Sequence, residues 1–478
     1  MSIGIRSYGA YVPRTRLPLA LIGGRPGKEG GPEKAVAWND EDAVTMAVSS
    51  AVHCLEGLDR SIVDAVFFAS TTYAFREKQA SALIARALDL QREVRTADYS
   101  GSLRAGTTAL RAAFDAVSAG SARNVLVIAS DARMAAPQSP LEANFGDGAV
   151  AFLVSGSGAI AALDGQYAVA DEIVDVWRSE GDPFVHSWED RFVVQEGYTP
   201  RICEAVSGLL ESSSASLDDF TRLALYAPDA RSHGTAARQL GASADQLVPP
   251  LFGRLGNTGT AFAPMQLALA LEGAAPGDRI LVASYGDGAE ALAFSISDAI
   301  LKLDSRRGVS WHLARRRPAA SYDAYLKARS LTTREWQTAG DPGLSATVHF
   351  RERDDDVSLR GQQCNACQAI QFPAQRVCES CFAKDDFSPV RLSDRIGKVV
   401  TYTFDFFFPT PEPPTIVTVT EVDGARIHLQ LVNCRPEDTK IGLPVEFVFR
   451  RIHQGGGRPN YFWKGNPVDT ANAENPEA

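Results

Sequence analysis

The sequence predicts an α/β fold of two similar halves, followed by a small cysteine-rich module and an all-β barrel. Three observations lead to this fold class. Apolar strands alternate with helices over residues 1–300, four cysteines then occur in two Cys-x-x-Cys pairs, and alternating strand patterns follow these cysteines. Uninterrupted apolar strands that alternate with helices are typical of a sheet covered on both faces.

Composition narrows the classes of function. A chain of 478 residues is too long to fold around a single hydrophobic core, so we expect roughly two or three domains. The formal net charge of -10 disfavours nucleic acid as a partner. No apolar run reaches the ~18 residues of a membrane span, and Met1–Pro13 lacks a signal-peptide pattern. We expect a cytoplasmic protein that neither spans a membrane nor binds nucleic acid.

The elements of the first half follow from hydrophobic periodicity. Apolar runs predict strands over Ile3–Val12, Ala65–Ser70 and Asn124–Ser130. Helical spacing predicts helices over Glu41–Cys54 and Gln79–Leu88. The strands at Ala65 and Asn124 are continuous apolar runs, so we expect them to be buried on both faces.

A turn between an extended segment and a helix lies within Tyr99–Leu110. Small residues precede Leu103, and apolar residues at helical spacing continue over Ala105–Val117. Such a turn exposes one side chain and several backbone N–H groups, and enzymes place nucleophiles and oxyanion holes there. Leu103 carries no reactive atom, so it is assigned to substrate binding. Gly106 is assigned there too, because it permits close backbone approach.

The same order of elements recurs after residue 220. Arg222–Tyr226 repeats a buried strand of the first half, and Gly259-Thr opens a helix as Gly106-Thr does. The tetrapeptide Gly-Asp-Gly-Ala begins at positions 146 and 286, each time before an alternating strand. Single matches of this length arise by chance, but three in one order favour an internal duplication. Two packed halves leave a site between them, lined by the turns at Leu103 and Asn257 and by the strand end at Tyr226.

Four cysteines in a short segment predict a zinc site. Cys364-x-x-Cys367 and Cys378-x-x-Cys381 are separated by ten residues, and two such pairs supply four thiolates at tetrahedral zinc spacing. Four protein ligands leave no open coordination position, so the expected Zn is structural. The alternative is a set of four unrelated reduced cysteines. The remaining cysteines are scattered and form no disulfide framework.

Strand patterns continue beyond these cysteines. Lys398–Phe404, Thr415–Val422, Ala425–Val432 and Leu443–Phe449 alternate like the strands of a small barrel. Between the two halves and this module, breaker residues surround a helical segment at Tyr322–Arg329. This pattern predicts a linker that contains an adaptor helix.

Four motifs in residues 1–300 carry a family resemblance: Ser7-Tyr-Gly-Ala-Tyr-Val-Pro13, Phe145-Gly-Asp-Gly-Ala149, Leu255-Gly-Asn-Thr-Gly259 and Ser284-Tyr-Gly-Asp-Gly288. Together they resemble the thiolase superfamily, and the nearest branch looks like ketoacyl synthase III and hydroxymethylglutaryl-CoA synthase. The resemblance implies a five-layered α-β-α-β-α fold of two related halves. It also implies a homodimer and a thioester substrate on coenzyme A or acyl carrier protein.

The cysteine-rich module and the barrel resemble the rubredoxin-like zinc-ribbon and OB-fold proteins that accompany thiolase-superfamily enzymes. That resemblance implies a role in forming an acyl-CoA channel. An OB-fold alone suggests nucleic acid, which the acidic charge disfavours. The expected domains are thiolase-like halves at 1–160 and 161–300, a linker with an adaptor helix at 301–345, a zinc ribbon at 346–390, an OB-fold at 391–468, and a disordered polar tail at 469–478.

The family's site residues are transferred to this sequence one position at a time. The cysteine nucleophile matches Leu103, the histidine falls at or near Tyr226, and the asparagine matches Asn257. The acid of hydroxymethylglutaryl-CoA synthases falls at Thr71–Tyr73, which holds no carboxylate. The resemblance therefore implies an acyl-thioester site that lacks its covalent nucleophile.

Non-covalent chemistry remains available to such a site. Cleavage of a C–C bond beside a thioester needs an oxyanion hole for the enolate and a base for the β-hydroxyl proton. Asn257 and Tyr226 are the candidates for this aldol or retro-aldol chemistry, with the tyrosine pKa of ~10 lowered by its neighbours. The alternative for Tyr226 is a packed core tyrosine. Some thiolase-like partners of zinc-ribbon proteins look like retro-aldolases that use tyrosines, and this resemblance favours the catalytic alternative.

Further candidates are assigned by position. Ser102 and Tyr73 are additional catalytic candidates, and Gly256 and Tyr285 are additional substrate-binding candidates. Ser102 either forms an acyl ester or caps the helix, and the two tyrosines either line the site or only pack. His233 either supplies a base or is a solvent-exposed loop residue.

Two cysteines outside the zinc module have a simpler interpretation. Cys54 and Cys203 lie within helical patterns and are expected to be buried structural thiols rather than displaced nucleophiles. Two other functions stay open beside the aldol chemistry. One is an acyltransferase that acts through Ser102, and the other is a non-catalytic subunit that binds acyl-CoA and supports an active relative.

Overall fold

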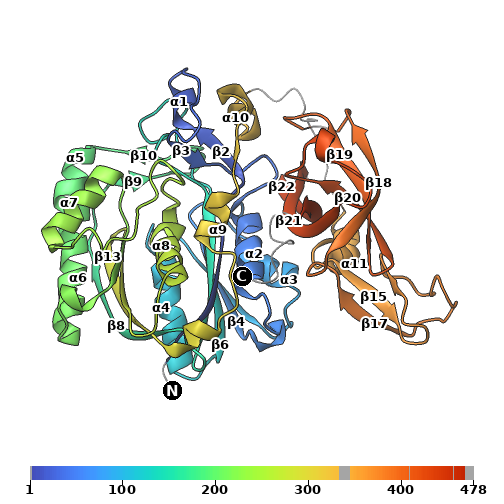
Figure 1. Cartoon of the computed structure of the whole chain (residues 1–478), viewed down its shortest axis with the longest axis horizontal. Coiled ribbons are helices and arrows are strands. Elements are labelled where there is room, and N and C mark those ends of the chain that lie inside the picture. Colours follow the sequence, from blue (N-terminus) through green and yellow to red (C-terminus); the bar gives the residue numbers. More distant parts are fainter. Residues whose placement is uncertain (1–2, 333–344, 409, 456, 469–478) are drawn as a thin grey trace. The chain divides into compact units, whose positions relative to one another are not determined.

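The computed structural model describes residues 3–332, 345–408, 410–455 and 457–468, and the chain forms two compact units (Figure 1). The first unit comprises Met1–Ala85 and Leu90–Tyr325, and the second comprises Arg86–Asp89 and Leu326–Ala478. Among the described residues, no helix is long and apolar enough to cross a membrane. The predicted tail at 469–478 and part of the predicted linker, 333–344, lie outside the described residues.

A nine-stranded sheet forms the centre of the first unit, in the order β11-β12-β13-β8-β1-β7-β6-β4-β5. Most of its strands are apolar along their whole length, as expected for strands covered on both faces. Their bounds are β1 Gly4–Tyr11, β4 Ala65–Ala69, β5 Arg95–Tyr99, β6 Asn124–Asp131, β7 Gly148–Ser155, β8 Ala161–Ala170, β11 Arg222–Leu225, β12 Arg279–Tyr285 and β13 Gly288–Ile296.

The strand order shows the predicted duplication. Along β1-β7-β6-β4 the pairings are antiparallel, antiparallel and parallel, and along β8-β13-β12-β11 they follow the same sequence. In the first half, β5 pairs in parallel with β4, and a single parallel bridge between Leu223 and Leu247 takes its place in the second. Pairing of β1 with β8, where Gly4 lies opposite Ala162, joins the two half-sheets. The duplication is confirmed at the level of topology.

Helices complete five layers (Figure 1). α4 (Ala105–Ser118) packs on the first half-sheet, α8 (Phe262–Glu272) packs on the second, and the two helices contact each other as a central layer. α2 (Ala43–Cys54) covers the outer face of the first half-sheet, and α6 (Thr199–Ser213) covers that of the second. The predicted α-β-α-β-α arrangement is therefore confirmed.

Local sequence explains where these helices begin and why the central pair fits. Asp42 is the N-cap of α2, and its side chain accepts hydrogen bonds from the N–H groups of Val44 and Thr45. These bonds satisfy donors that a helix start leaves free. In α4, a Cβ at Gly106 would lie 2.2 Å from the carbonyl oxygen of Thr260. Only glycine therefore allows α4 to approach the turn before α8 this closely.

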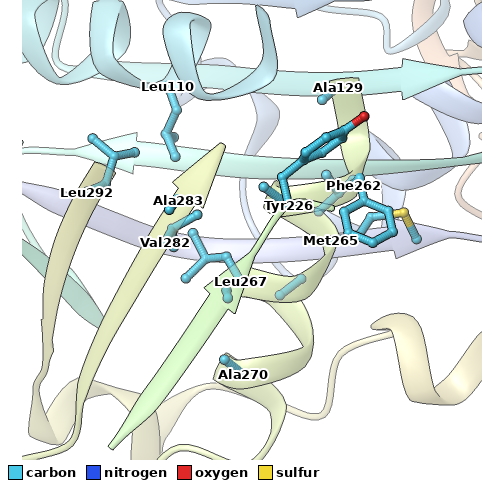
Figure 2. Close-up of a cluster of buried hydrophobic side chains, with 14 of the residues drawn as sticks. Leu110, Ala129, Tyr226, Phe262, Met265, Leu267, Ala270, Val282, Ala283 and Leu292 are labelled. Carbon is cyan, nitrogen blue, oxygen red and sulfur yellow. The ribbon is translucent and has the colours of Figure 1, made fainter. Parts of the chain in front are cut away.

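The core of the first unit is shared by both halves. Figure 2 shows Leu110 of α4, Leu267 of α8, Val282 of β12 and Leu292 of β13 in one cluster with Tyr226. All five residues are buried. Because burying a large apolar side chain contributes about 1.5–3 kcal/mol, this cluster stabilises the association of the halves as well as each half.

The segment after residue 301, predicted as a linker, packs on the first unit over its described part as far as Tyr325. The Ala10 N–H donates to the Arg307 carbonyl oxygen (3.0 Å), and β14 pairs in parallel with β2. The remaining elements of this unit are β2 Thr15–Pro18, α1 Leu19–Ile22, β3 Glu33–Ala35, α3 Ala80–Ala87, β9 Val176–Trp177, β10 His186–Ser187, α5 Asp190–Phe192, α7 Ala230–Leu240, α9 Val309–Ala314 and β14 Arg317–Pro318, while α10 spans Tyr322–Ala328.

The second unit contains a three-stranded sheet in the order β16-β15-β17 and a closed barrel in the order β18-β19-β20-β22-β21. Five strands closed in this way form the predicted OB-fold type of barrel. The sequence predicted four barrel strands and missed β22, because Pro459 and Gly465 interrupt its pattern. The bounds are α11 Ala346–Asp356, β15 Arg360–Cys364, β16 Ile370–Gln371, β17 Phe387–Arg391, β18 Gly397–Asp405, β19 Thr415–Val422, β20 Ala425–Leu431, β21 Pro444–Gly455 and β22 Arg458–Pro467.

Candidate active site and zinc site

The two Cys-x-x-Cys pairs form matching turns in the second unit. In the first turn Gln368 donates its backbone N–H to the Cys364 carbonyl oxygen (2.8 Å), and in the second Phe382 donates to the Cys378 carbonyl oxygen (3.1 Å). Both donor residues have positive φ angles, 64° and 62°. The same chain reversal therefore follows each pair and brings its two sulfur atoms together.

The four sulfur atoms fit one tetrahedral ion. The Sγ atoms of Cys364 and Cys381 are 3.6 Å apart, as are those of Cys367 and Cys378, and all four lie within 4.8 Å of one another. Zn–S bonds of ~2.3 Å in a tetrahedron need sulfur–sulfur distances of about 3.8 Å. The predicted structural zinc site is confirmed.

Tyr226 and Asn257, predicted to share a site, are in direct contact within the first unit. The Asn257 Nδ2 donates to the Tyr226 hydroxyl oxygen (3.2 Å) and to the Ala227 carbonyl oxygen (3.0 Å). The Asn257 Oδ1 accepts from the backbone N–H of Gly259 (2.9 Å). These bonds fix the amide and engage both of its hydrogens. In this arrangement Asn257 acts on the phenol oxygen of Tyr226.

Tyr226 follows β11 in an apolar and aromatic environment. Its ring contacts Phe262 edge to face with centroids 5.4 Å apart and stacks on Tyr285 at 6.2 Å. Figure 2 shows the ring beside Phe262, with its hydroxyl pointing away from Leu267. Only 3% of Tyr226 is exposed. This burial raises the pKa of Tyr226, while Arg133 and the Asn257 hydrogen bond act in the opposite direction. The net pKa is raised, so the phenol holds its proton near neutral pH.

Asp131, at the end of β6, is a buried carboxylate that was not predicted. Its Oδ1 accepts from the Ser70 Oγ, the Thr71 N–H and the Thr72 Oγ at 2.8–3.0 Å. Its Oδ2 accepts from the Thr71 Oγ (3.1 Å) and the Thr260 N–H (2.8 Å). Five donors saturate both oxygens, so Asp131 ties the loop after β4 to the turn before α8. The available signal was a charged residue at the end of a buried strand.

Two further charged residues near Tyr226 were also missed. Arg133 is buried, and its guanidinium carbon lies 4.2 Å from the centroid of the Phe145 ring. The Asp175 carboxyl comes from the segment after β8 and interacts electrostatically with Arg133 and with Tyr285. No motif marks either residue, because each reaches the site only through the tertiary fold.

The predicted turn at Leu103 forms between β5 and α4. Leu103 is 8% exposed and belongs to the same apolar cluster as Tyr226 and Tyr285. The Ser102 hydroxyl accepts a long hydrogen bond from the Arg104 N–H (3.4 Å). Arg104 is the N-cap of α4 and the helix has no side-chain capping bond, so the predicted capping by Ser102 does not form. Within the described part of the chain, the Leu103 N–H has no hydrogen-bond acceptor.

Gly286 brings the second Gly-Asp-Gly motif onto this turn. A Cβ at Gly286 would lie 2.8 Å from the Ser102 Oγ and 2.9 Å from the Leu103 nitrogen, so only glycine fits there. Tyr285, which precedes Gly286, stacks on Tyr226. The structure therefore brings the two predicted turns and both tyrosines together, while their roles stay predictions.

Three other predicted site residues make packing contacts. Tyr73 is half-buried, and its ring centroid lies 6.2 Å from that of Phe68. Gly256 packs against Gly146, because a Cβ at Gly256 would lie 2.7 Å from the Gly146 nitrogen. Gly106 serves the approach of α4 to the turn before α8. A contact of any of the three with substrate stays a prediction.

His233 differs from the exposed loop residue that was one of the two predictions. It lies buried on α7, because Asp229 caps a helix over residues 230–240 and turns His233 inward. Burial lowers the pKa of His233, which keeps the imidazole neutral. Cys54, at the end of α2, is buried, and burial raises its pKa to about 12. Cys203 lies on α6 with its pKa raised by partial burial, so both cysteines fit the structural alternative.

Comparison with known proteins identifies both parts of the chain. Residues 355–387 match the family described as ChsH2, rubredoxin-like zinc ribbon domain. Hydroxymethylglutaryl-CoA synthase of Pyrococcus horikoshii is 32% identical over 336 residues, which cover 68% of this chain and 96% of the relative. The chain belongs to the hydroxymethylglutaryl-CoA synthase family. The synthase of Aeropyrum pernix is 33% identical over 341 residues, covering 69% of this chain and 94% of the relative.

Solved structures of other enzymes align with this chain and have the same fold. An HMG-CoA synthase complexed with CoA aligns with a TM-score of 0.64 and 22% identity, over 72% of this chain and 94% of that chain. The 3-oxoacyl-[acyl-carrier-protein] synthase III from Aquifex aeolicus aligns with a TM-score of 0.56 and 20% identity, over 61% of this chain and 99% of that chain. The predicted thiolase-like fold, with its zinc ribbon and barrel, is confirmed.

Proposed function

We propose that this protein is an enzyme that makes or breaks a C–C bond beside the thioester of an acyl-coenzyme A, without an acyl-enzyme intermediate. The observation that carries the proposal is the hydrogen bond from Asn257 to the Tyr226 hydroxyl oxygen. Tyr226 belongs to the same apolar cluster as Leu103, which lies in the turn between β5 and α4. A proton-transfer group is thus held in place where a covalent nucleophile is absent.

Tyr226 supplies the proton transfer in either direction. In cleavage, the phenolate takes the β-hydroxyl proton, the Cα–Cβ bonding pair moves toward the thioester carbonyl, and a carbonyl compound leaves. In synthesis, the phenol gives its proton to the alkoxide that forms. The raised pKa of Tyr226 makes the phenol the resting form, which suits synthesis. Cleavage needs the phenolate, and the Asn257 N–H and the positive charge of Arg133 both stabilise that form.

The Leu103 turn supplies the electrophilic part of the site. The Leu103 N–H has no acceptor in the described chain and lies just before α4, whose N-terminus favours negative charge. An enolate oxygen placed there gains a hydrogen bond that is stronger than in the ground state. The leucine side chain excludes water and offers no atom for acylation.

Coenzyme A is the proposed carrier, because the relatives are named as synthases of a CoA thioester and one aligned HMG-CoA synthase is complexed with CoA. Acyl carrier protein is the alternative, since a 3-oxoacyl-[acyl-carrier-protein] synthase has the same fold. A homodimer is proposed from the family resemblance alone. Ser102 as an acyltransferase nucleophile gains no support, because within the described residues its hydroxyl has only the long contact from the Arg104 N–H.

The test is turnover of 3-hydroxyacyl-CoA thioesters by the purified full-length chain, followed as release of the shorter acyl-CoA by liquid chromatography with mass spectrometry. Tyr226→Phe should lower the rate about 10²–10⁴-fold, because it removes the proton-transfer group. Tyr167→Phe, which removes the hydroxyl of a partly exposed tyrosine on β8, should keep the parent rate.

Three outcomes would contradict this proposal in different ways. Parent-rate turnover by Tyr226→Phe would exclude this tyrosine from the mechanism. An acyl adduct on Ser102, found by peptide mass spectrometry, would favour an acyltransferase. Complete absence of turnover by the purified chain, with thioester binding retained, would favour a non-catalytic acyl-CoA-binding subunit.

A further inference from the structure

We propose that Asp175 is the second proton-transfer residue of this site and exchanges a proton with the α-carbon of the acyl thioester. The inference rests on the proposed function, because only C–C chemistry through an enolate requires this transfer. Cleavage places the β-hydroxyl proton on Tyr226 and leaves an enolate whose α-carbon needs a proton of its own. Two atoms of the substrate therefore exchange protons, and Tyr226 accounts for one of them.

The hydrogen bonds of the buried Asp131 and Glu290 and of the half-buried Asp175 distinguish the roles of these three carboxyls. Asp131 has both oxygens saturated by five donors. Glu290 accepts from the hydroxyls of Thr107 and Thr108 and pairs with Arg111. Asp175 accepts one regular hydrogen bond, from the Val176 N–H through its Oδ1, and the Tyr285 hydroxyl is a second, looser partner of its carboxyl. Of these three carboxyls Asp175 accepts the fewest regular hydrogen bonds, so its oxygens are the most available to a substrate.

The surroundings of Asp175 place it among the groups of the site. The Asp175 carboxylate interacts electrostatically with Arg133 and Tyr226. The Tyr285 hydroxyl also interacts with this carboxylate. Tyr285 is 3% exposed, and its hydroxyl makes no regular hydrogen bond within the described chain. A buried hydroxyl without a partner costs stability unless a ligand completes it. The carboxyl and this hydroxyl together therefore mark a position that a polar substrate group would fill.

The segment that carries Asp175 is held at two points that follow Asp175 in the chain. The Arg178 guanidinium donates to the Thr71 carbonyl oxygen (2.6 Å), and the Val185 N–H donates to the Met134 carbonyl oxygen (2.9 Å). These contacts join the segment to the loops that follow β4 and β6. They give Asp175 a defined position, as a proton-transfer group requires.

The protonation of Asp175 suits this exchange. Burial raises the pKa of Asp175, the Val176 N–H and the Tyr285 hydroxyl act to lower it, and the negative charge of Asp287 acts to raise it. Tyr285, Tyr226 and the Arg133 guanidinium are the other titratable or charged groups that face it. The carboxyl therefore keeps its proton to a higher pH than an exposed aspartate.

The proposed steps balance in protons. In cleavage the enolate α-carbon takes the proton of the Asp175 carboxyl, and the C–H bond forms as the O–H bond breaks. Asp175 is left as a carboxylate and Tyr226 as a phenol. The phenol of Tyr226 is the resting form, so transfer of its proton to the Asp175 carboxylate precedes each cleavage, and the cycle consumes no external acid or base. In the reverse direction, the Asp175 carboxylate removes the α-proton.

The experiment measures exchange of the α-hydrogens of acetyl-CoA, propionyl-CoA and octanoyl-CoA in D₂O by NMR, using the full chain. The parent protein should incorporate deuterium at the α-carbon. Asp175→Asn should lower this exchange at least about 100-fold while its thermal unfolding midpoint and its affinity for CoA stay at the parent values. Glu172→Gln, which removes the same charge from an exposed position of the same segment, should exchange at the parent rate. Tyr226→Phe should retain exchange, because Tyr226 acts on the β-oxygen.

The results separate this inference from the proposed function. Parent-rate exchange by Asp175→Asn would overturn the role of Asp175 and leave the C–C chemistry intact. Loss of exchange in Tyr226→Phe with retention in Asp175→Asn would assign the α-proton to Tyr226 instead. Absence of exchange by the parent protein with all three thioesters would overturn the enolate chemistry itself, and the role of Asp175 with it.

Discussion

The two halves of the first unit place different chemistry at equivalent strand ends. The register of the parallel pairs β4–β6 and β11–β12 makes Ser70 and Asp131 the counterparts of Tyr226 and Tyr285. In the first half this pair is joined by a hydrogen bond of 3.0 Å, within a carboxylate site saturated by donors. In the second half the two rings stack, and the Tyr285 hydroxyl makes no regular hydrogen bond within the described chain.

This difference shows that the two halves, although similar in topology, have different groups at their equivalent strand ends. Polar groups at the end of the first pair of strands satisfy one another, so they stabilise the fold and offer a substrate little. The second pair keeps hydroxyls in an apolar setting, with the Tyr226 oxygen held by Asn257. Buried hydroxyls without a regular hydrogen bond lower the free energy of unfolding. They are rare in folded proteins and are found mainly at functional sites.

The largest effect on stability should come from a substitution of Asp131, whose two carboxylate oxygens are saturated by hydrogen-bond donors. Asp131→Asn places amide hydrogens opposite the backbone donor of either Thr71 or Thr260, so it should lower the free energy of unfolding by about 3 kcal/mol. Denaturant unfolding of the full chain measures this change. Asp115→Asn, at an exposed position of α4, is the matched control and should be neutral. Equal stability of the two variants would contradict a structural role for Asp131.

A smaller effect should follow from removing the hydrogen bond to Tyr226. Asn257→Ala withdraws a donor that lowers the pKa of Tyr226, so this pKa should rise further above its usual range. In the cleavage direction the rate depends on the phenolate and increases with pH. The variant should therefore be about 10–100-fold slower, with its pH profile displaced to higher pH. A loss of rate without this displacement would contradict an action of Asn257 through Tyr226.

The smallest effect on stability is expected at the counterpart of Asp131 in the second half. Tyr285→Phe removes a buried hydroxyl that lacks a regular hydrogen bond, so the free energy of unfolding should change by less than about 1 kcal/mol. The same denaturant experiment that is used for Asp131→Asn measures it. A destabilisation as large as that of Asp131→Asn would show that both strand-end pairs are structural and would remove the contrast between the halves.

Local patterns predicted most of the fold because periodicity reports burial directly. The barrel strand Thr415–Val422 was predicted with the bounds of β19, and Ala65–Ser70 differs from β4 by one residue. β8 was missed, because one face of it is exposed and Gly165 interrupts its alternation. The helix around His233 was missed for a similar reason, since its sequence contains glycine and few large apolar residues.

The candidate site was predicted only in part. The duplication and the family resemblance placed Tyr226 near Asn257, and the structure brings them within hydrogen-bond distance. Asp131, Arg133 and Asp175 were missed, because their positions depend on contacts between segments far apart in sequence. The Asp175 segment is the clearest case, since only its tertiary contacts at Thr71 and Met134 bring it to the site.

Intact-protein mass spectrometry during turnover tests the central claim, that this site works without a covalent intermediate, most directly. The parent protein should turn over its acyl-CoA without a mass increase of one acyl group at any time. Leu103→Cys should gain that acyl group, because it places a thiol at the turn before α4. An acyl adduct on the turning-over parent protein would contradict the account.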